Sequence, residues 1–167
     1  MVNCKVILTG HFGVGKTSLF NQFLYQKFDD RYLTTIGVKV DKKVVTIEKQ
    51  EVAMMLWDIA GEVNQNKVPV NYFLGAAVII FVFDLTRPST WKTMQEDLEY
   101  LQKMNPNCII KVIGNKKDVV SAEKVAEILA EIEQDVEMTT SAKTGENINT
   151  LFDQIATEIL LPHESSK

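Results

Sequence analysis

Short apolar runs alternate with helically spaced apolar residues along the whole chain. The run at residues 78–83 contains no polar residue, which is typical of a strand covered on both faces of a parallel sheet. Residues 6–8 and 109–113 predict further strands, and residues 148–159 show the apolar spacing of a helix. Because strands that alternate with helices form a mostly parallel sheet wrapped on both faces, we expect an α/β fold. Ligands of such sheets bind beyond the carboxyl ends of the strands.

Three other segments complete the predicted architecture. Residues 38–47 and 52–57 predict a β-hairpin, which adds one antiparallel edge strand. The apolar spacing over residues 91–101 predicts a helix, and residues 136–138 predict the last strand. The expected fold is a six-stranded, mostly parallel sheet with one antiparallel edge strand and helices on both faces.

The composition indicates one globular domain over residues 1–160, followed by a short polar tail at 161–167. Apolar residues make up 46% of the chain and charged residues 24%, which excludes collagen-like and disordered classes. The net charge is −4, so the composition argues against a nucleic-acid partner. Cys4 and Cys108 lie in apolar stretches, and we expect them to be buried, reduced thiols.

The sequence predicts no membrane segment. Its longest apolar run, residues 76–83, is less than half of the roughly 20 residues that a membrane helix needs. The chain shows no signal-peptide layout at its start and no cysteine for prenylation at its end. We expect a cytoplasmic protein, whose membrane attachment, if any, depends on a tail or partner outside this chain.

Residues 10–17, GHFGVGKT, match the pattern G-x-x-x-x-G-K-[ST] between a predicted strand and a predicted helix. In this arrangement successive backbone N–H groups and the helix N-terminus form an anion-binding nest. Lys16 supplies a charge to the β- and γ-phosphates, and the Thr17 hydroxyl can bind Mg²⁺. The motif predicts a nucleoside triphosphate site without choosing the base. The expected phosphate-binding residues are Gly13, Val14, Gly15, Lys16, Thr17 and Ser18.

Two predicted strands end in an aspartate that could position Mg²⁺, Asp58 and Asp84. Only Asp58 begins a D-x-x-G step, in which the carboxylate reaches a metal-bound water while the N–H of Gly61 meets the γ-phosphate. We therefore assign Asp58 to the metal site and interpret Asp84 as a strand-end residue hydrogen-bonded to nearby backbone.

The segment 115–118, NKKD, follows the predicted fifth strand and selects among bases. The Asp118 carboxylate can accept two hydrogen bonds from N1–H and the N2 amino group of guanine. Adenine has neither donor there, so it would leave a buried carboxylate unpaired. Asn115 would brace neighbouring loops and the Lys116 stem would cover the base. A charged turn without a ligand is the alternative interpretation of this segment.

The segment 141–143, SAK, follows the last predicted strand and is a weaker signal. It falls in the next strand-end loop, where the backbone N–H of Ala142 could donate to guanine O6. We include Ser141, Ala142 and Lys143 in the predicted base site.

Together these motifs resemble those of the small GTPases of the Ras superfamily, over essentially the whole chain. Residues 32–38 and 72–76 are most similar to the Rab and Ras branches and do not separate the two. The segments that carry the resemblance are 10–17, Thr35, 58–61, 115–118 and 141–143.

The resemblance implies a P-loop NTPase fold of the small G-domain type and a monomer that binds GTP, GDP and Mg²⁺. It implies that Phe28 stacks on guanine, although anchoring a helix end is an equally natural role. Thr35 would be the second hydroxyl on Mg²⁺, with its N–H on the γ-phosphate. Residues 29–39 and 60–73 would be the two switches, which effectors, exchange factors and GTPase-activating proteins contact.

The resemblance also implies an apolar effector-facing cluster of Trp57, Val40 and Tyr72, for which core packing is the alternative. The implied catalytic set is Lys16, Thr35, Gly61 and Glu62.

Two residues depart from the family pattern. Glu62 stands where the family usually has a glutamine that orients the attacking water. A carboxylate accepts but cannot donate hydrogen bonds, and it repels the γ-phosphate by up to about 4 kcal/mol at about 4 Å. Phe12 replaces a small residue and would crowd an inserted arginine finger. Gln65 and its asparagine neighbours, Asn64 and Asn66, are alternative groups for positioning water.

Three functions follow from these observations. We favour a GTP-operated switch with slow, Mg²⁺-dependent hydrolysis. The alternative from another class is a GTP-binding scaffold with negligible hydrolysis. A P-loop kinase or ATPase is a third, which residues 115–118 disfavour because ATP would have to compete well with GTP.

Overall fold

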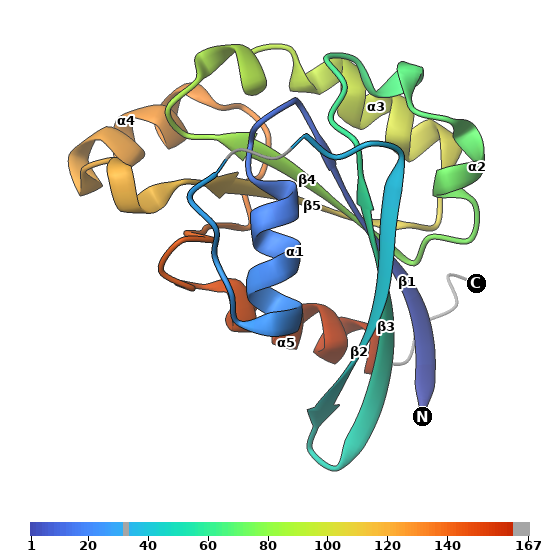
Figure 1. The fold of residues 1–167 in the computed structure, drawn as a ribbon. Coiled ribbons are helices and arrows are strands. Elements are labelled where there is room, and N and C mark those ends of the chain that lie inside the picture. Colours follow the sequence, from blue (N-terminus) through green and yellow to red (C-terminus); the bar gives the residue numbers. More distant parts are fainter. Residues whose placement is uncertain (32–33, 162–167) are drawn as a thin grey trace.

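A six-stranded sheet with the strand order β2-β3-β1-β4-β5-β6 forms the centre of the molecule (Figure 1). The structure is a computed structural model that describes residues 1–31 and 34–161. The strands are β1 (Val2–Gly10), β2 (Val38–Ile47), β3 (Gln50–Ile59), β4 (Val78–Asp84), β5 (Ile109–Asn115) and β6 (Met138–Thr139). The α-helices are α1 (Lys16–Tyr25), α2 (Val70–Phe73), α3 (Met94–Met104), α4 (Ala122–Glu131) and α5 (Ile148–Leu160). The 3₁₀-helices are η1 (Gln65–Lys67), η2 (Pro88–Thr90) and η3 (Lys117–Val119).

The sheet has the topology that the sequence predicts. The β2–β3 pair is antiparallel, and the other four neighbouring pairs are parallel. The carboxyl ends of β1, β3, β4, β5 and β6 therefore meet at one edge of the sheet. The α/β prediction with one antiparallel edge strand is confirmed.

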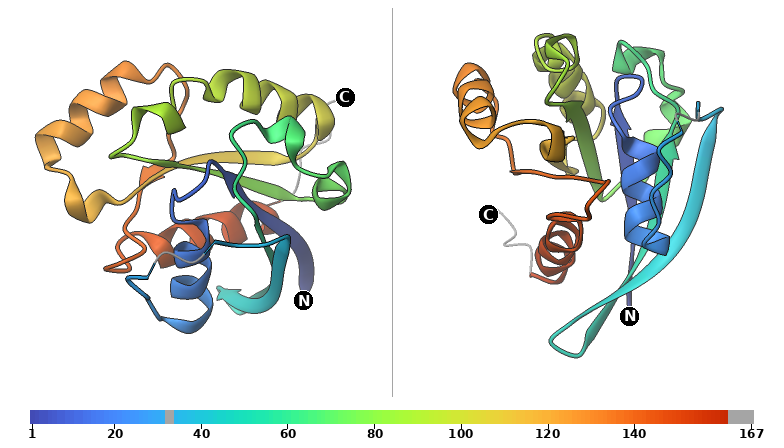
Figure 2. Two further views of the ribbon diagram at one scale, coloured as in Figure 1. Left: turned by 45° about the horizontal axis from the view of Figure 1, so that its top comes forward. Right: turned by 60° about the vertical axis from the view of Figure 1, so that its left-hand side comes forward.

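The two faces of the sheet pack against different helices, as Figure 2 shows in its left-hand view. Each face of the sheet carries its own hydrophobic core, and alternate residues of β4 pack into one or the other. Ile80 lies in the core with α1 and α5, whereas Phe81 lies in the core with α2, α3 and α4. Every residue of β4 is buried. This double burial explains why the run at 78–83 contains no polar residue.

Several predicted boundaries are wrong. β1 (Val2–Gly10) and β3 (Gln50–Ile59) extend beyond the predicted 6–8 and 52–57. The last strand is Met138–Thr139 rather than 136–138, and Val136 instead packs its side chain against the α3–α4 core. The helix predicted from residue 91 begins at Met94. Trp91 ends the turn of η2, and its ring lies edge-on to Phe83 with centroids 5.7 Å apart. Apolar spacing alone did not separate the 3₁₀ turn from the helix.

Cys4 and Cys108 are buried and unbridged, as expected. Burial raises the pKa of both thiols to about 11, which keeps them protonated at neutral pH. Among the helices in the described ranges, none has the length and apolar character needed to cross a bilayer. Residues 162–167 of the predicted tail and residues 32–33 of the predicted first switch lie outside the described residues.

Candidate nucleotide-binding site

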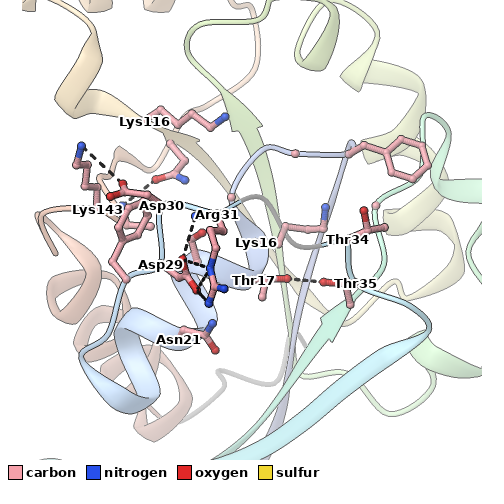
Figure 3. A pocket seen from close by; sticks show the side chains of 18 of the residues that line it. Lys16, Thr17, Asn21, Asp29, Asp30, Arg31, Thr34, Thr35, Lys116 and Lys143 are labelled. Atoms are coloured by element: carbon pink, nitrogen blue, oxygen red, sulfur yellow. Dashed lines mark hydrogen bonds and ion pairs between the residues drawn. The ribbon is translucent and has the colours of Figure 1, made fainter.

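A cavity of about 290 Å³ opens at the carboxyl edge of the sheet (Figure 3). Loops after β1, β3 and β5, the loop after β6 and the segment after α1 all contribute to its wall. The predicted residues that line it are Gly13, Gly15, Lys16, Thr17, Ser18, Phe28, Thr35, Gly61, Asn115, Lys116, Asp118, Ala142 and Lys143. The structure therefore brings together groups that are spread over more than 130 positions of the chain, from Gly13 to Lys143.

Lys16 lies at the first turn of α1, at one end of the cavity, and is 6% exposed. Its ammonium donates to the carbonyl of His11 at 2.7 Å and to that of Gly10 at 3.3 Å. Burial lowers the pKa of Lys16 to about 8, although the charge of Asp58 opposes this shift. A negatively charged ligand in the cavity would favour the charged form of this side chain.

Three oxygen-bearing side chains meet beside Lys16. The Thr17 hydroxyl donates to Asp58 Oδ2 at 2.6 Å and lies 2.5 Å from the hydroxyl of Thr35. Asp58 Oδ1 is buried and has no hydrogen-bond partner in the described part of the chain. Burial raises the pKa of Asp58, against the hydrogen bond from Thr17 and the charge of Lys16. Hydroxyl and carboxylate oxygens are the ligands that Mg²⁺ prefers, so this set fits the metal.

Asp84, the other strand-end aspartate, takes part in different contacts. Its Oδ1 accepts the backbone N–H of Thr86 at 2.8 Å, as expected. Its Oδ2 forms an ion pair with Lys116 Nζ at 2.8 Å. The Asp84 carboxylate is fully buried and is engaged by the β4–α3 loop and by the NKKD segment.

Asn115 holds three loops together at the other end of the cavity. Its Nδ2 donates to the Val14 carbonyl at 3.0 Å, and its Oδ1 accepts from the Thr140 hydroxyl at 3.0 Å. Its Oδ1 also accepts the N–H of Ala142 at 3.2 Å. This last bond departs from the prediction, because the N–H expected to donate to a guanine O6 already has an acceptor. A β-carbon on Gly15 would lie 2.2 Å from Asn115 Nδ2, so this brace requires glycine.

Asp118 faces the cavity from η3 and is partly held by a serine behind it. The hydroxyl of Ser141 donates to Asp118 Oδ1 at 2.7 Å, and Ser141 is fully buried. Within the described residues no group donates to Asp118 Oδ2, and Asp118 lines the cavity. Ser141 thus acts on Asp118 rather than lining the cavity itself.

Four predicted residues do not line the cavity: Val14, Asp58, Glu62 and Ser141. Asp58 reaches it through Thr17. The N–H of Glu62 donates to the Gly10 carbonyl at 3.2 Å, which holds Glu62 beside the phosphate loop. A β-carbon on Gly61 would lie 2.7 Å from Cα of Phe12, so the two loops are in direct contact.

Gln65 cannot position water at the cavity as the sequence suggested, because its side chain is fully buried. The Thr9 hydroxyl donates to its Oε1, and its own backbone N–H donates to Asp97 at 2.8 Å. Asn64 and Asn66 are exposed. Of the apolar cluster, Trp57 and Tyr72 pair with ring centroids 6.3 Å apart while Val40 is exposed.

Sequence reasoning did not assign Asn21 or Val119 to the cavity wall, and it placed Asp29, Asp30, Arg31 and Thr34 only within a switch. Asn21 lies four positions after Thr17, on the same face of α1, and this spacing is a usable signal. Asp29 and Arg31 form an exposed ion pair at 2.8 Å, which is visible in Figure 3. No sequence motif predicts this pair.

Comparison with known proteins agrees with this geometry. The family model described as the Ras family matches residues 5–161. Ras-related protein RABF2a of Arabidopsis thaliana is 34% identical over 160 residues, covering 93% of this chain and 80% of the relative. Ras-related protein RABF2b of the same plant is 32% identical with the same coverage. The chain therefore belongs to the Ras family of small GTPases.

Proposed function

We propose that the chain is a GTP-operated switch that hydrolyses GTP slowly, with Glu62 as the residue that limits the rate. Membership of the Ras family supports guanine-nucleotide binding and, in general terms, effectors and regulators. The single observation that carries the proposal is the cavity with Lys16 and the hydroxyl cluster at one end and Asp118 at the other.

Each end of the cavity has its own task. Asp118 accepts the N1–H and N2 amino donors of guanine, and Asn115 holds the loops on which the base rests. Lys16 and the N–H groups of the phosphate loop bind the phosphate oxygens. Thr17, Thr35 and Asp58 would hold Mg²⁺, which neutralises charge developing on the phosphates when bound.

The switches are linked to this site by short contacts. The hydroxyl of Thr35 lies against Thr17, and the N–H of Ala60 donates to the Gly37 carbonyl at 2.9 Å. The first contact ties Thr35 to the metal site, and the second ties Gly37 to Ala60 of the second proposed switch. Loss of the γ-phosphate removes the ligand that Thr35 and Gly61 share, so both segments are expected to loosen together.

Glu62 supports slow hydrolysis. Its backbone is held beside the phosphate loop by the hydrogen bond to the Gly10 carbonyl. A carboxylate there cannot donate a hydrogen bond to the transition state and repels the γ-phosphate. If this effect is complete, the chain works instead as a GTP-binding scaffold that stays in one state.

Single-turnover phosphate release from GTP tests the proposal, with wild type compared with Glu62→Gln. We expect the glutamine variant to be about 10-fold faster or more, because an amide can both accept from water and donate. Glu51→Gln, an exposed change on the far hairpin, is the matched control and should change nothing. Equal rates for Glu62→Gln and wild type would reject Glu62 as the limiting residue. Wild-type release on a timescale of days with normal GTP affinity would favour the scaffold.

A further inference from the structure

Arg87 lies in the loop after β4. Its guanidinium contacts the phosphate loop from outside the cavity. Its Nη1 donates to the Phe12 carbonyl at 2.7 Å, and its Nη2 lies 3.3 Å from Nδ1 of His11. Arg87 does not line the cavity in the described part of the chain. It therefore acts on the backbone of the loop and not on the ligand.

The geometry of the Phe12–Gly13 peptide shows what this contact does. The peptide is trans and planar, so its carbonyl and its N–H point to opposite sides. The carbonyl points to Arg87, outside the cavity. The N–H of Gly13 therefore points away from Arg87, and Gly13 itself lines the cavity. Inward-pointing N–H groups are the donors with which such a loop binds anions.

The orientation of this peptide has to be held by another group because one of its residues is glycine. Gly13 has φ +67°, and glycine adopts positive and negative φ with similar ease, so the peptide can turn over at little cost. The preceding carbonyl, that of His11, is held by Lys16. Arg87 gives the next carbonyl the same kind of cationic partner.

Arg87 is itself anchored to the base-binding side of the site. Its Nη1 lies 3.8 Å from Oδ2 of Asp84, a fully buried carboxylate. The same oxygen pairs with Lys116 at 2.8 Å, and Lys116 lines the cavity next to Asp118. A continuous set of contacts thus runs from the NKKD segment through Asp84 and Arg87 to the phosphate loop.

We propose that Arg87 is a positioning residue that turns the Gly13 N–H toward the phosphates of the bound nucleotide, with Asp84 linking it to Lys116. The inference rests on the proposed function, since it requires a guanine nucleotide in the cavity. Gly13 lies at the Lys16 end, away from Asp118. Its N–H is therefore expected to reach the phosphates beyond the first one.

The test compares the affinities of GMP, GDP and a non-hydrolysable GTP analogue for the full chain and for Arg87→Ala. We expect GDP and the GTP analogue to bind roughly 10- to 100-fold more weakly, as is usual for loss of a hydrogen bond to a charged group. GMP should change less than about 2-fold, because its single phosphate stays near the base. Arg87→Lys should restore part of the loss, since an ammonium can donate to the Phe12 carbonyl. The ³¹P NMR shift of the β-phosphate of bound GDP should change most in Arg87→Ala and less in Arg87→Lys, relative to wild type.

Lys92→Ala is the matched control, because Lys92 is an exposed cation just beyond the same turn. It should leave all three affinities unchanged. GDP affinity within about 2-fold of wild type in Arg87→Ala would overturn the inference. An equal loss for GMP would also overturn it, because it would indicate general loosening of the fold. A wild-type chain that binds no guanine nucleotide would overturn the proposed function, and this inference with it.

Discussion

In the proposed function, base selection depends on the carboxylate of Asp118. Guanine presents two donors to its carboxylate, and the Ser141 hydroxyl holds one carboxylate oxygen from behind. Xanthine carries a carbonyl in place of the amino group of guanine, so it presents an acceptor at that position. An amide side chain can donate to that acceptor, whereas a carboxylate cannot.

Asp118→Asn should therefore reverse the preference of the site between guanine and xanthine nucleotides. We expect GDP affinity to fall by about 100-fold and xanthosine diphosphate affinity to rise by at least about 10-fold. Competition against a fluorescent guanine nucleotide measures both. Glu123→Gln, an exposed change at the start of the next helix, is the control. An unchanged ratio of the two affinities would show that Asp118 does not contact the base.

We expect Lys16 to make nucleotide binding depend on pH. Its pKa is lowered from an ordinary 10.5 to about 8 in the free protein, and bound phosphate favours the charged form and raises that pKa again. At a pH between the pKa of the free protein and the higher pKa of the complex, binding of the nucleotide is coupled to uptake of one proton by Lys16. Affinity should be constant below about pH 8 and fall as the pH rises above it. Titrations of GDP affinity from about pH 7 to about pH 8.5, where guanine keeps its N1 proton, should show this, and Lys16→Met should remove the dependence. A flat wild-type profile would contradict it.

The sequence located most residues that touch the cavity because the chemistry fixes their type and spacing locally. Lys16, Thr17 and Asp118 lie within short motifs at strand ends. Arg87 was missed because it acts through the backbone of another loop, and its partner is 75 positions away. The sequence around residue 87 contains no motif that predicts such a contact.

At the level of elements, η1 anchors residues 60–73, the proposed second switch. Gln65 is fully buried, accepts the Thr9 hydroxyl and sends its backbone N–H to Asp97 on α3. These contacts tie the middle of residues 60–73 to β1, which leads into the phosphate loop, and to α3. One part of the switch is thus fixed, while its neighbours Asn64 and Asn66 are exposed.

Gln65→Ala should loosen this segment and lower global stability modestly. The variant leaves the buried Thr9 hydroxyl without its acceptor, and loss of a buried partner costs about 1–3 kcal/mol. Urea unfolding should show a decrease of this size, and hydrogen exchange should rise over residues 60–73. Asn66→Ala is the matched control on the exposed face. Unchanged exchange in Gln65→Ala would show that η1 does not hold the switch.

The sequence predicted long elements better than short ones. β4 was predicted because burial on both faces leaves an unbroken apolar run. β6 has only two residues, and its pairing with Ile113 and Gly114 of β5 sets its limits. Such limits depend on tertiary pairing, which local periodicity does not contain. η1 was not predicted, since its burial comes from Thr9 and α3 rather than from its own polar sequence.

At the level of the whole molecule, the nucleotide would act as a shared core for loops from both halves of the chain. The wall of the cavity runs from Phe12 to Lys143, so a bound nucleotide would join loops that are far apart in the sequence. Ligands that bind the folded state alone stabilise it by mass action. The increase in stability depends on all the loops that contact the nucleotide, whereas a substitution tests one residue.

GDP with Mg²⁺ should therefore raise the melting temperature of nucleotide-free protein substantially. A ligand at about 1,000 times its Kd adds about 4 kcal/mol of stability, and for a chain of 167 residues this corresponds to about 8–16 °C. Chelation of Mg²⁺ should reverse part of the increase, because Thr17, Thr35 and Asp58 then lose their shared partner. ATP at the same concentration should give little change, since Asp118 would face an acceptor at N1. An equal shift with ATP would mean that the base end of the cavity does not select guanine, and the site would then be one for nucleotides in general.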